Sequence, residues 1–255
     1  MFQLKTASEV AVMREAGRVV ARVLAAVEAA VAPGVRLSEL DALAAELIAQ
    51  HGAMPSFLGY HPEWAPSPYP GVLCLSVNDV IVHGIPSRKP LRAGDLLSVD
   101  CGAYLNGYHG DAAITVGVGE IDARGRLLMD ATARALAAGI ASARVGGRLG
   151  DVSHAVEQVA RAGGYGIPDG LGGHGVGRAM HEEPSVENTG QAGRGMALRE
   201  GLVIAIEPML TEGGRDDYLT QPDGWTVVTT DRSRAAHFEH TIAIEAAGPR
   251  ILTAL

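Results

Sequence analysis

Two aspartates, Asp100 and Asp111, lie on either side of the dipeptide Asn106-Gly107. Asn-Gly is the strongest two-residue signal for a β-hairpin turn. With the turn at this dipeptide, Gly102 lies opposite Asp111. Asp100 then lies one diagonal step away on the same face, roughly 7–8 Å from Asp111 at the backbone. Two carboxylates among apolar neighbours repel each other and are poorly solvated. The pair therefore favours a metal ion between them, with one Asp facing solvent or capping a turn as the open alternative.

Two more candidate ligands follow in the second half of the chain. His174 lies in the segment 172–177, where only glycines and one valine surround it, so a ligand can approach closely. A phosphate-binding loop is the competing interpretation, but the Lys-Ser/Thr of such a loop does not follow. Glu207 comes at the end of the apolar run 203–206 and is held by Pro208, which places a carboxylate at the end of a buried strand.

Three further residues have side chains suited to catalysis or metal binding. Glu239 belongs to the segment 236–244, on the more polar face that it shares with His237, so exposure to solvent is the alternative. His83 is flanked by apolar residues and a turn, and His181 follows His174 by seven residues. Each of these signals is weak by itself.

Together, four carboxylates and one imidazole form an oxygen-rich donor set that is typical of divalent Mn, Fe or Co. The four negative charges match the positive charges of two such ions. A thiolate site is not indicated, because Cys74 and Cys101 lack the spacing of metal ligands. The candidate metal ligands are Asp100, Asp111, His174, Glu207 and Glu239.

Helices and strands that position these residues follow from periodicity and end signals. Ser8 precedes a helical pattern over 10–31, and Ser38-Glu-Leu-Asp41 resembles a capping box that starts a second helix ending at Gly52. Helices are also predicted at 121–143 and 150–162, with a Gly-rich loop at 163–177. Strands are predicted at 72–77, 96–104, 108–118, 201–207, 225–230 and 236–245. This order predicts an α+β architecture with two similar halves around one sheet.

Bulk properties exclude several classes of function. A net charge of −8 argues against direct nucleic-acid binding and against anionic membranes. Only two cysteines occur in 255 residues, which fits a reducing cytosol rather than a disulfide framework. Neither a signal-peptide core nor an apolar run long enough to span a membrane is present. With no evident linker, we expect residues 1–255 to form one domain.

Five motifs, in matching order and spacing along nearly the whole chain, resemble those of type I methionine aminopeptidases, in the short form without an added N-terminal domain. The motifs are Asn78–Pro86, Asp100 with His109-Gly-Asp111, Gly173–Pro184, Ile206-Glu207-Pro208 and Phe238–Thr241.

The resemblance implies a pita-bread α+β fold, with two pseudo-symmetric halves around a curved antiparallel sheet and a centre of two divalent metal ions. By matching positions, Asp111 and Glu239 bridge both ions, His174 and Glu207 complete the ligands of one ion, and Asp100 chelates the other.

It also implies a reaction, in which a hydroxide bridging the two metals attacks the scissile carbonyl and releases an initiator methionine, preferably before a small second residue. Glu207 is expected to shuttle the proton, His181 to stabilise the oxyanion, and His83 to contact the scissile amide nitrogen.

Six positions match the substrate-binding residues of the family. From the sequence alone, their aromatic members could equally pack beneath a loop. Phe57, Met180 and a longer loop at 62–67 depart from the family pattern at positions expected to affect fine specificity. The six are Tyr60, Tyr69, Cys74, His83, His181 and Trp225.

The expected partners are nascent polypeptide N-termini in the cytoplasm, bound by a monomer, with a transient ribosome contact left open. Two alternatives remain: a proline-specific aminopeptidase, which usually carries an additional N-terminal domain, and a non-catalytic binding protein of the same fold, which tends to lose ligands. Of the other histidines, we expect His51 and His154 on solvated helix surfaces, and His109 and His240 in hydrogen bonds that support the metal ligands.

Overall fold

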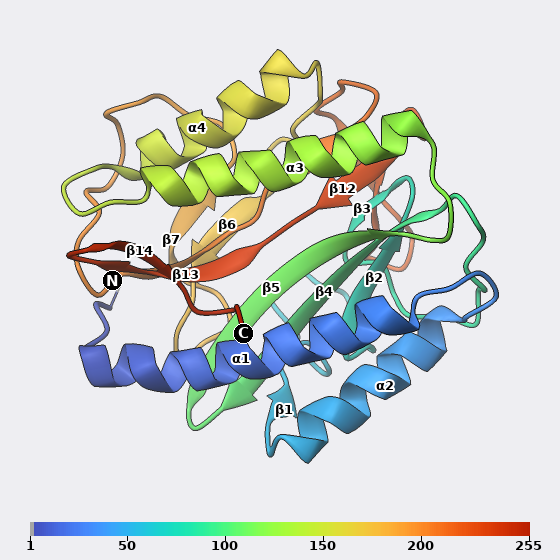
Figure 1. The fold of residues 1–255 in the computed structure, drawn as a ribbon, viewed down its shortest axis with the longest axis horizontal. Helices are drawn as coiled ribbons and strands as arrows, with labels where there is room; N and C mark the ends of the chain where they lie inside the picture. Colours follow the sequence, from blue (N-terminus) through green and yellow to red (C-terminus); the bar gives the residue numbers. More distant parts are fainter. Residues whose placement is uncertain (1–2) are drawn as a thin grey trace.

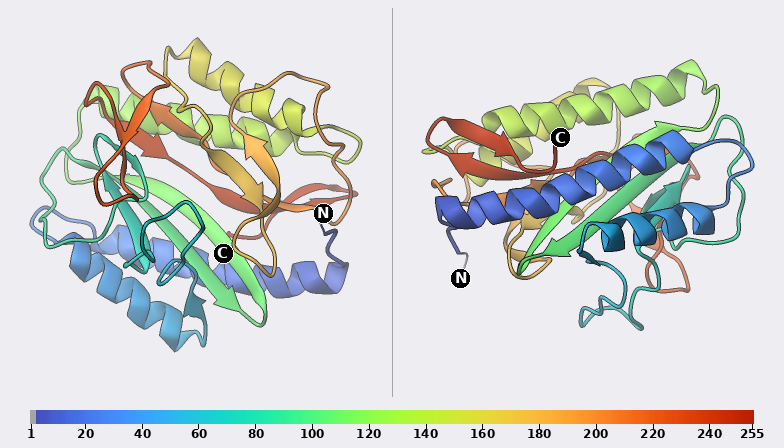
Figure 2. Two further views of the ribbon diagram at one scale, coloured as in Figure 1. Left: turned by 180° about the vertical axis from the view of Figure 1, so that it is seen from behind. Right: turned by 60° about the horizontal axis from the view of Figure 1, so that its bottom comes forward.

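The computed structural model describes residues 3–255, in which both helix pairs lie in front of the strands in the view of Figure 1, one pair above the other. The first pair is α1 (Ala7–Ala30) and α2 (Leu37–Gln50), and the second pair is α3 (Ala123–Ser142) and α4 (Leu149–Ala162). Seen from behind, the strands lie in front of the helices (Figure 2). The predicted α+β class is confirmed.

The strands fall into four hydrogen-bonded sheets. Those of the first half are β1 (Met54–Pro55), β2 (Leu73–Val77), β3 (Val80–Val82), β4 (Leu96–Leu105) and β5 (Tyr108–Gly117). Those of the second half are β6 (Gly172–Gly175), β7 (Glu182–Glu187), β8 (Val203–Ile206), β9 (Met209–Thr211), β10 (Tyr218–Thr220), β11 (Val227–Thr229), β12 (Ala235–His237), β13 (His240–Glu245) and β14 (Gly248–Ile251).

The two helix starts in the first half differ from the prediction. The N-cap of α1 is Thr6, not Ser8; its hydroxyl and the carboxylate of Glu9 form a capping box. Helix α2 begins earlier than the predicted Ser38–Asp41 box, because Glu39 accepts the backbone N–H of Arg36 at 2.7 Å. Asp41 Oδ1 accepts instead the backbone N–H groups of residues 72 and 73, which ties α2 to the start of β2.

The hairpin of β4 and β5 is confirmed in its turn and its register. Asn106 and Gly107 have φ angles of 52° and 88°, as a two-residue hairpin turn with two left-handed residues requires. Gly102 pairs with Asp111, and Asp100 pairs with the residue two positions beyond Asp111. The two aspartates are therefore diagonal neighbours on one face.

Two predicted segments have a different structure. The stretch 163–177 was expected to be a loop, but Gly172–Gly175 forms β6 within a sheet of order β14-β13-β8-β6-β7. Gly173 permits this strand, because an added Cβ would lie 2.1 Å from the Ala205 carbonyl oxygen. The strand expected over 236–245 is interrupted at Phe238 and Glu239, which separate β12 from β13.

Helix α1 packs closely across β5 and the C-terminal segment. A Cβ on Gly110 would lie 2.7 Å from the backbone nitrogen of Gly17, and a Cβ on Gly17 would lie 2.4 Å from the carbonyl oxygen of Leu252. Each half has its own apolar core, one beneath α1 and α2 and one beneath α3 and α4. Within residues 3–255, no helix is both long and apolar enough to cross a membrane.

Candidate metal centre and substrate pocket

The structure brings the five predicted metal ligands to one cavity of about 310 Å³. They come from both halves of the chain: Asp100 from β4, Asp111 from β5, His174 from β6, Glu207 from the end of β8, and Glu239 from the two residues between β12 and β13. Pairing between strands thus brings ligands of the first half next to ligands of the second half, which are more than 60 residues away in the sequence.

Backbone contacts between the halves fix this meeting point. Glu239 and Ala113 exchange backbone hydrogen bonds of 2.9 and 3.4 Å, so Glu239 lies beside β5. The hydroxyl of Thr241 accepts the N–H of Asp111 at 3.1 Å and donates to its carbonyl oxygen at 2.7 Å. Asp111 and Glu239 are therefore held on adjoining backbone segments.

His174 presents one ring nitrogen to the carboxylates. Its Nδ1 lies 2.9 Å from the Gly175 carbonyl oxygen, which can only accept, so Nδ1 carries the proton. The lone pair of Nε2 is left free, as in most metal-binding histidines. This Nε2 lies 3.8 Å from Asp111 Oδ2 and 3.7 Å from Glu207 Oε1, with the side chains of all three residues largely buried.

The four carboxylates cannot all be ionised in the absence of a cation. Loss of hydration raises the pKa of Asp100 and of Glu207 to about 7. The same burial, together with the neighbouring carboxylates, holds the pKa values of Asp111 and Glu239 well above their usual range. Three buried carboxylate oxygens have no hydrogen-bond partner among the described residues: Asp100 Oδ1, Asp111 Oδ1 and Glu239 Oε1.

A divalent cation fits this arrangement. It would supply the missing partner of each oxygen and offset the repulsion that raises the pKa values. Ligand atoms of Asp111, His174 and Glu239 lie within 4.8 Å of one another, and so do those of Glu207, His237 and Glu239. The site thus has the donors and the spacing for divalent metal binding.

His237 is the residue that sequence reasoning left out of this site. It was placed on the more polar face of the segment 236–244, with exposure as an alternative, but it is 1% exposed and its Nε2 lies 3.4 Å from Glu207 Oε2. Exposure of Glu239, the alternative to metal binding, is excluded, since this residue is 2% exposed. The signal was the two-residue spacing from His237 to Glu239, which places both side chains on one face of an extended segment.

The two predicted catalytic histidines line the same cavity. His83 follows β3 with a φ of 59°, and loss of hydration lowers its pKa to about 4, which keeps the imidazole neutral at neutral pH. The ring centroid of His181 lies 4.1 Å from that of His174 and 5.3 Å from that of Tyr60.

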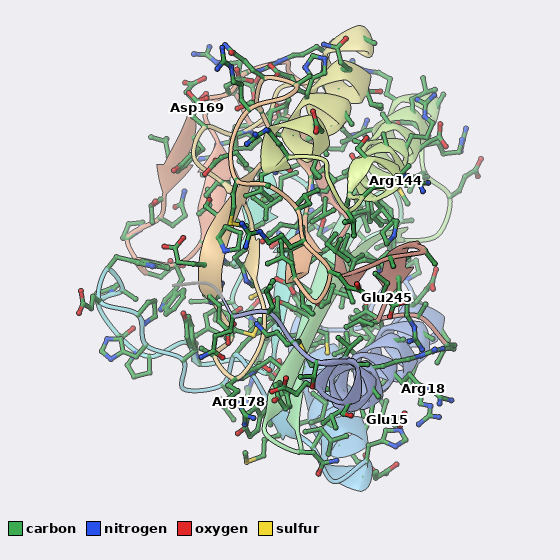
Figure 3. The ribbon with its side chains drawn as sticks, turned by 90° about the vertical axis from the view of Figure 1, so that its left-hand side faces the viewer. Glu15, Arg18, Arg144, Asp169, Arg178 and Glu245 are labelled. Atoms are coloured by element: carbon green, nitrogen blue, oxygen red, sulfur yellow. The ribbon has the colours of Figure 1, made fainter. Side chains whose placement is uncertain are left out.

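The loop that leads to His181 is fastened to the first half of the chain. Arg178 lies on the outer surface, with its guanidinium 4.5 Å from the centroid of the Tyr108 ring (Figure 3). The buried Lys5 ammonium lies 2.6 Å from the carboxylate of Glu182, the residue next to His181. These contacts set the position of the loop relative to β5.

The remaining predicted substrate-binding residues, Tyr60, Tyr69, Cys74 and Trp225, also line the cavity. The hydroxyl of Tyr69 donates to the carbonyl oxygens of Leu73 and Gly84 at 3.1 and 2.9 Å, which braces the segment next to His83.

The residues that depart from the family pattern are close by. Phe57 lines the cavity, and Met180 packs in the same apolar cluster as Trp225. Trp64, in the loop 62–67, was not predicted as a site residue. It is 62% exposed, yet its ring centroid lies 4.9 Å from that of Trp225 and 6.2 Å from that of His83.

The other histidines lie outside the metal centre. His51 is exposed, as expected, whereas His154 is only half-buried on α4, with Nδ1 3.3 Å from the Gly190 carbonyl oxygen. The expectation that His109 and His240 support metal ligands is wrong, because their Nδ1 atoms contact the hydroxyls of Ser56 and Thr253 at 2.8 and 2.9 Å.

Comparison with known proteins places this geometry in a family. Residues 11–246 match the model of metallopeptidase family M24. Methionine aminopeptidase 1 of Mycobacterium tuberculosis is 50% identical, over 98% of this chain and 94% of the relative. The crystal structure of methionine aminopeptidase from Thermotoga maritima superposes with a TM-score of 0.95 at 41% identity, covering 100% of both chains. The prolidase from Pyrococcus furiosus shares the fold, with a TM-score of 0.78 at 23% identity; 99% of this chain matches 65% of that one.

Proposed function

The chain belongs to metallopeptidase family M24 and, within it, to the methionine aminopeptidases, and from this premise we propose that it removes the initiator methionine from polypeptides. The observation that carries the proposal is the cluster of four buried carboxylates and His174. Three of the carboxylate oxygens lack a hydrogen-bond partner among the described residues, and divalent cations would supply one. We extend it to residues 1–255 as one catalytic domain, supported by the family match over 11–246.

Two ions, Mn, Fe or Co, would be held by the five residues. Asp111 and Glu239, fastened side by side between the halves, would be shared by both ions; His174 and Glu207 would serve one ion and Asp100 the other. When bound, such ions make water more acidic and polarise a carbonyl group. Neutralisation of the four carboxylates by two divalent charges supports the number two.

Glu207 is the proposed proton carrier. Its carboxylate is largely buried in the cavity, 3.7 Å from His174 Nε2, and would accept a proton from the attacking water and return it to the leaving amine. His181 would donate a hydrogen bond to the carbonyl oxygen as negative charge develops there. The neutral imidazole of His83 would contact the scissile amide nitrogen.

The substrate pocket would accept the long, unbranched and apolar side chain of methionine. Its walls combine the Cys74 thiol with the rings of Tyr60, Tyr69 and Trp225, which suit contact with a thioether. A small second residue is the preferred neighbour in this proposal. Phe57 and Trp64 reach the same cavity and would set the fine specificity.

The proposal includes a monomer that acts on nascent polypeptides in the cytoplasm. Two free, buried cysteines support a reducing compartment. A ribosome contact would be transient, since the net charge of −8 does not favour RNA. The prolidase neighbour supports the fold alone, and the presence of all five candidate ligands disfavours a non-catalytic binding protein.

Cleavage of three peptides tests the proposal: Met-Ala-Ser, Leu-Ala-Ser and Ala-Pro-Ser, each with protein that has been stripped of metal and reloaded with Mn²⁺, Co²⁺ or Fe²⁺. Release of only the methionine is the expected result. Cleavage confined to the bond before proline would transfer the chain to the proline-specific enzymes. No cleavage by a folded, metal-loaded protein would favour the binding-protein alternative.

A further inference from the structure

His237 is a buried histidine whose Nε2 has no hydrogen-bond partner in the described part of the chain. The residue is 1% exposed and lies at the end of β12. A buried polar atom without a hydrogen-bond partner reduces the stability of the folded protein. Such an atom in a native structure therefore indicates a functional role or a missing ligand.

The side chain faces the metal centre. Its Nε2 lies 3.4 Å from Glu207 Oε2 and 3.9 Å from Glu239 Oε2. The shorter of these contacts lacks the geometry of a hydrogen bond, because Nε2 remains without a partner despite the proximity. A direct hydrogen bond to Glu207 therefore does not account for the position of the ring.

The backbone fixes the direction of this side chain. The N–H of His237 donates to the hydroxyl of Thr115 at 2.9 Å, and the same hydroxyl donates to the His237 carbonyl oxygen at 2.8 Å. His237 also pairs with Met209 of β9. The imidazole is thus held between two neighbouring strands before any ligand binds.

Glu207 lies between two imidazoles. Its Oε1 is 3.7 Å from His174 Nε2, and its Oε2 is 3.4 Å from His237 Nε2. Ligand atoms that are each ~2.0–2.2 Å from one ion lie roughly 3–4 Å from each other. The contacts of His237 are within this range, just as those of His174 are.

We propose that His237 Nε2 is a sixth protein ligand of the centre and binds an ion held by Glu207 and Glu239. This inference rests on the proposed two-ion centre and adds a second nitrogen donor to it. His237 would then join the ion that His174 and Glu207 serve, and its possible ligand atom lies within 4.8 Å of those of Glu207 and Glu239. A second imidazole favours Co²⁺ over Mn²⁺ relative to an all-oxygen site, because nitrogen ligands bind later divalent metals more strongly.

X-ray absorption of the Co²⁺-loaded protein tests the proposal, because scattering from imidazole rings counts the bound histidines. At two Co²⁺ per chain, the expected count is about one imidazole per ion in the wild type and about half of that in His237→Gln. His83→Ala, which removes another imidazole from the same cavity, is the matched control and leaves the count unchanged.

Metal affinity gives a second readout. His237→Gln is expected to weaken binding of one Co²⁺ by more than about tenfold, with a smaller loss for Mn²⁺. Affinity alone does not separate a ligand from a residue that supports one, so the imidazole count decides. A count near one half in the wild type itself, or a count that His237→Gln leaves unchanged, would overturn the proposal.

The wild-type count requires no variant, so misfolding of His237→Gln cannot hide the answer. Wild-type protein that cleaves Met-Ala-Ser but shows a single bound imidazole would overturn this inference and leave the proposed function intact. Protein that binds two imidazoles but cleaves none of the three peptides would support the ligand and contradict the function.

Discussion

The backbone of Glu239 pairs with that of Ala113, in hydrogen bonds of 2.9 Å from the Glu239 N–H and 3.4 Å from the Ala113 N–H. This pair joins the hairpin of the first half to the interruption between β12 and β13 of the second half. The carboxylate of Glu239 consequently lies beside that of Asp111, two residues before Ala113. A metal centre between the halves depends on this contact.

Glu239→Gln keeps the volume of the side chain but removes its charge. It also replaces one of the two oxygens that can bind a cation with an NH₂ group. We expect metal affinity to fall more than about 100-fold, beyond the loss typical of residues that only support a ligand. Metal content after dialysis measures the effect. Glu245→Gln is the control, since Glu245 lies on the outside of β13, paired with Arg250 (Figure 3). Equal metal content in both variants would contradict the assignment.

His83→Ala and His181→Ala are expected to lower kcat by about 10²–10⁴-fold while leaving metal content intact, because both histidines act on the substrate and not as ligands. Steady-state kinetics with Met-Ala-Ser, together with metal analysis, measures this. His154→Ala, on α4 and outside the cavity, is the control. Loss of metal from either site variant would show that the histidine is a ligand after all.

Metal binding is expected to release protons at acidic pH. The pKa values of Asp100 and Glu207 are raised from 3.8 and 4.5 to about 7, so both are mostly protonated at about pH 6 and must ionise to bind a cation. Affinity should therefore rise with pH through about pH 7. Calorimetry in buffers of different ionisation enthalpy counts the protons. A proton count that stays near zero at about pH 6 would contradict the raised pKa values.

The same shifts predict how the metal-free protein responds to pH. A raised pKa contributes stability that is complete below the unfolded value and is lost as the pH rises through the folded value. For Asp100 and Glu207 this loss falls between about pH 4 and pH 7. Metal-free wild type should lose more Tm over this interval than metal-free Asp100→Asn. Parallel Tm curves for the two proteins would contradict the prediction.

Trp64→Ala is expected to raise the KM for Met-Ala-Ser by about 3–10-fold, because an aromatic contact contributes about 0.5–1.5 kcal/mol. Since Trp64 is 62% exposed, the Tm should change little. Leu127→Ala, which truncates an exposed side chain on α3, is the control for general surface effects. An unchanged KM would indicate that Trp64 packs on Trp225 without reaching the substrate.

Gly17→Ala tests how closely α1 packs. Helix propensity alone predicts a gain of about 1 kcal/mol. The added Cβ, however, would lie 2.4 Å from the Leu252 carbonyl oxygen, so we expect a net loss of about 1–3 kcal/mol. Thermal or urea unfolding measures it, and metal content should not change. A rise in Tm would mean that the C-terminal segment moves away from α1 without cost.

The sequence predicted the features that depend on neighbours along the chain. The Asn106-Gly107 turn specifies the register of its hairpin, and the register brings Asp100 and Asp111 to one face. The four long helices followed from periodicity, with errors only at their ends, where Thr6 and Glu39 provide the caps.

Features that depend on distant contacts were harder to predict. Gly172–Gly175 resembled a loop because it becomes a strand only through close approach of β7 and β8. Exposure of His237 and Glu239 on their polar face stayed open as an alternative, since alternation does not reveal that both side chains are buried. The meeting of Glu239 with Asp111, more than 120 residues away, followed only from the family resemblance.

Release of methionine from Met-Ala-Ser by metal-free protein, before and after titration with Co²⁺ or Mn²⁺, tests the central claim most directly. The account predicts no release without metal, activity that returns as metal is added, and no recovery in Glu239→Gln over the same range. Full activity of the wild type after its metal content has been shown to be negligible, or full recovery in Glu239→Gln, would contradict it.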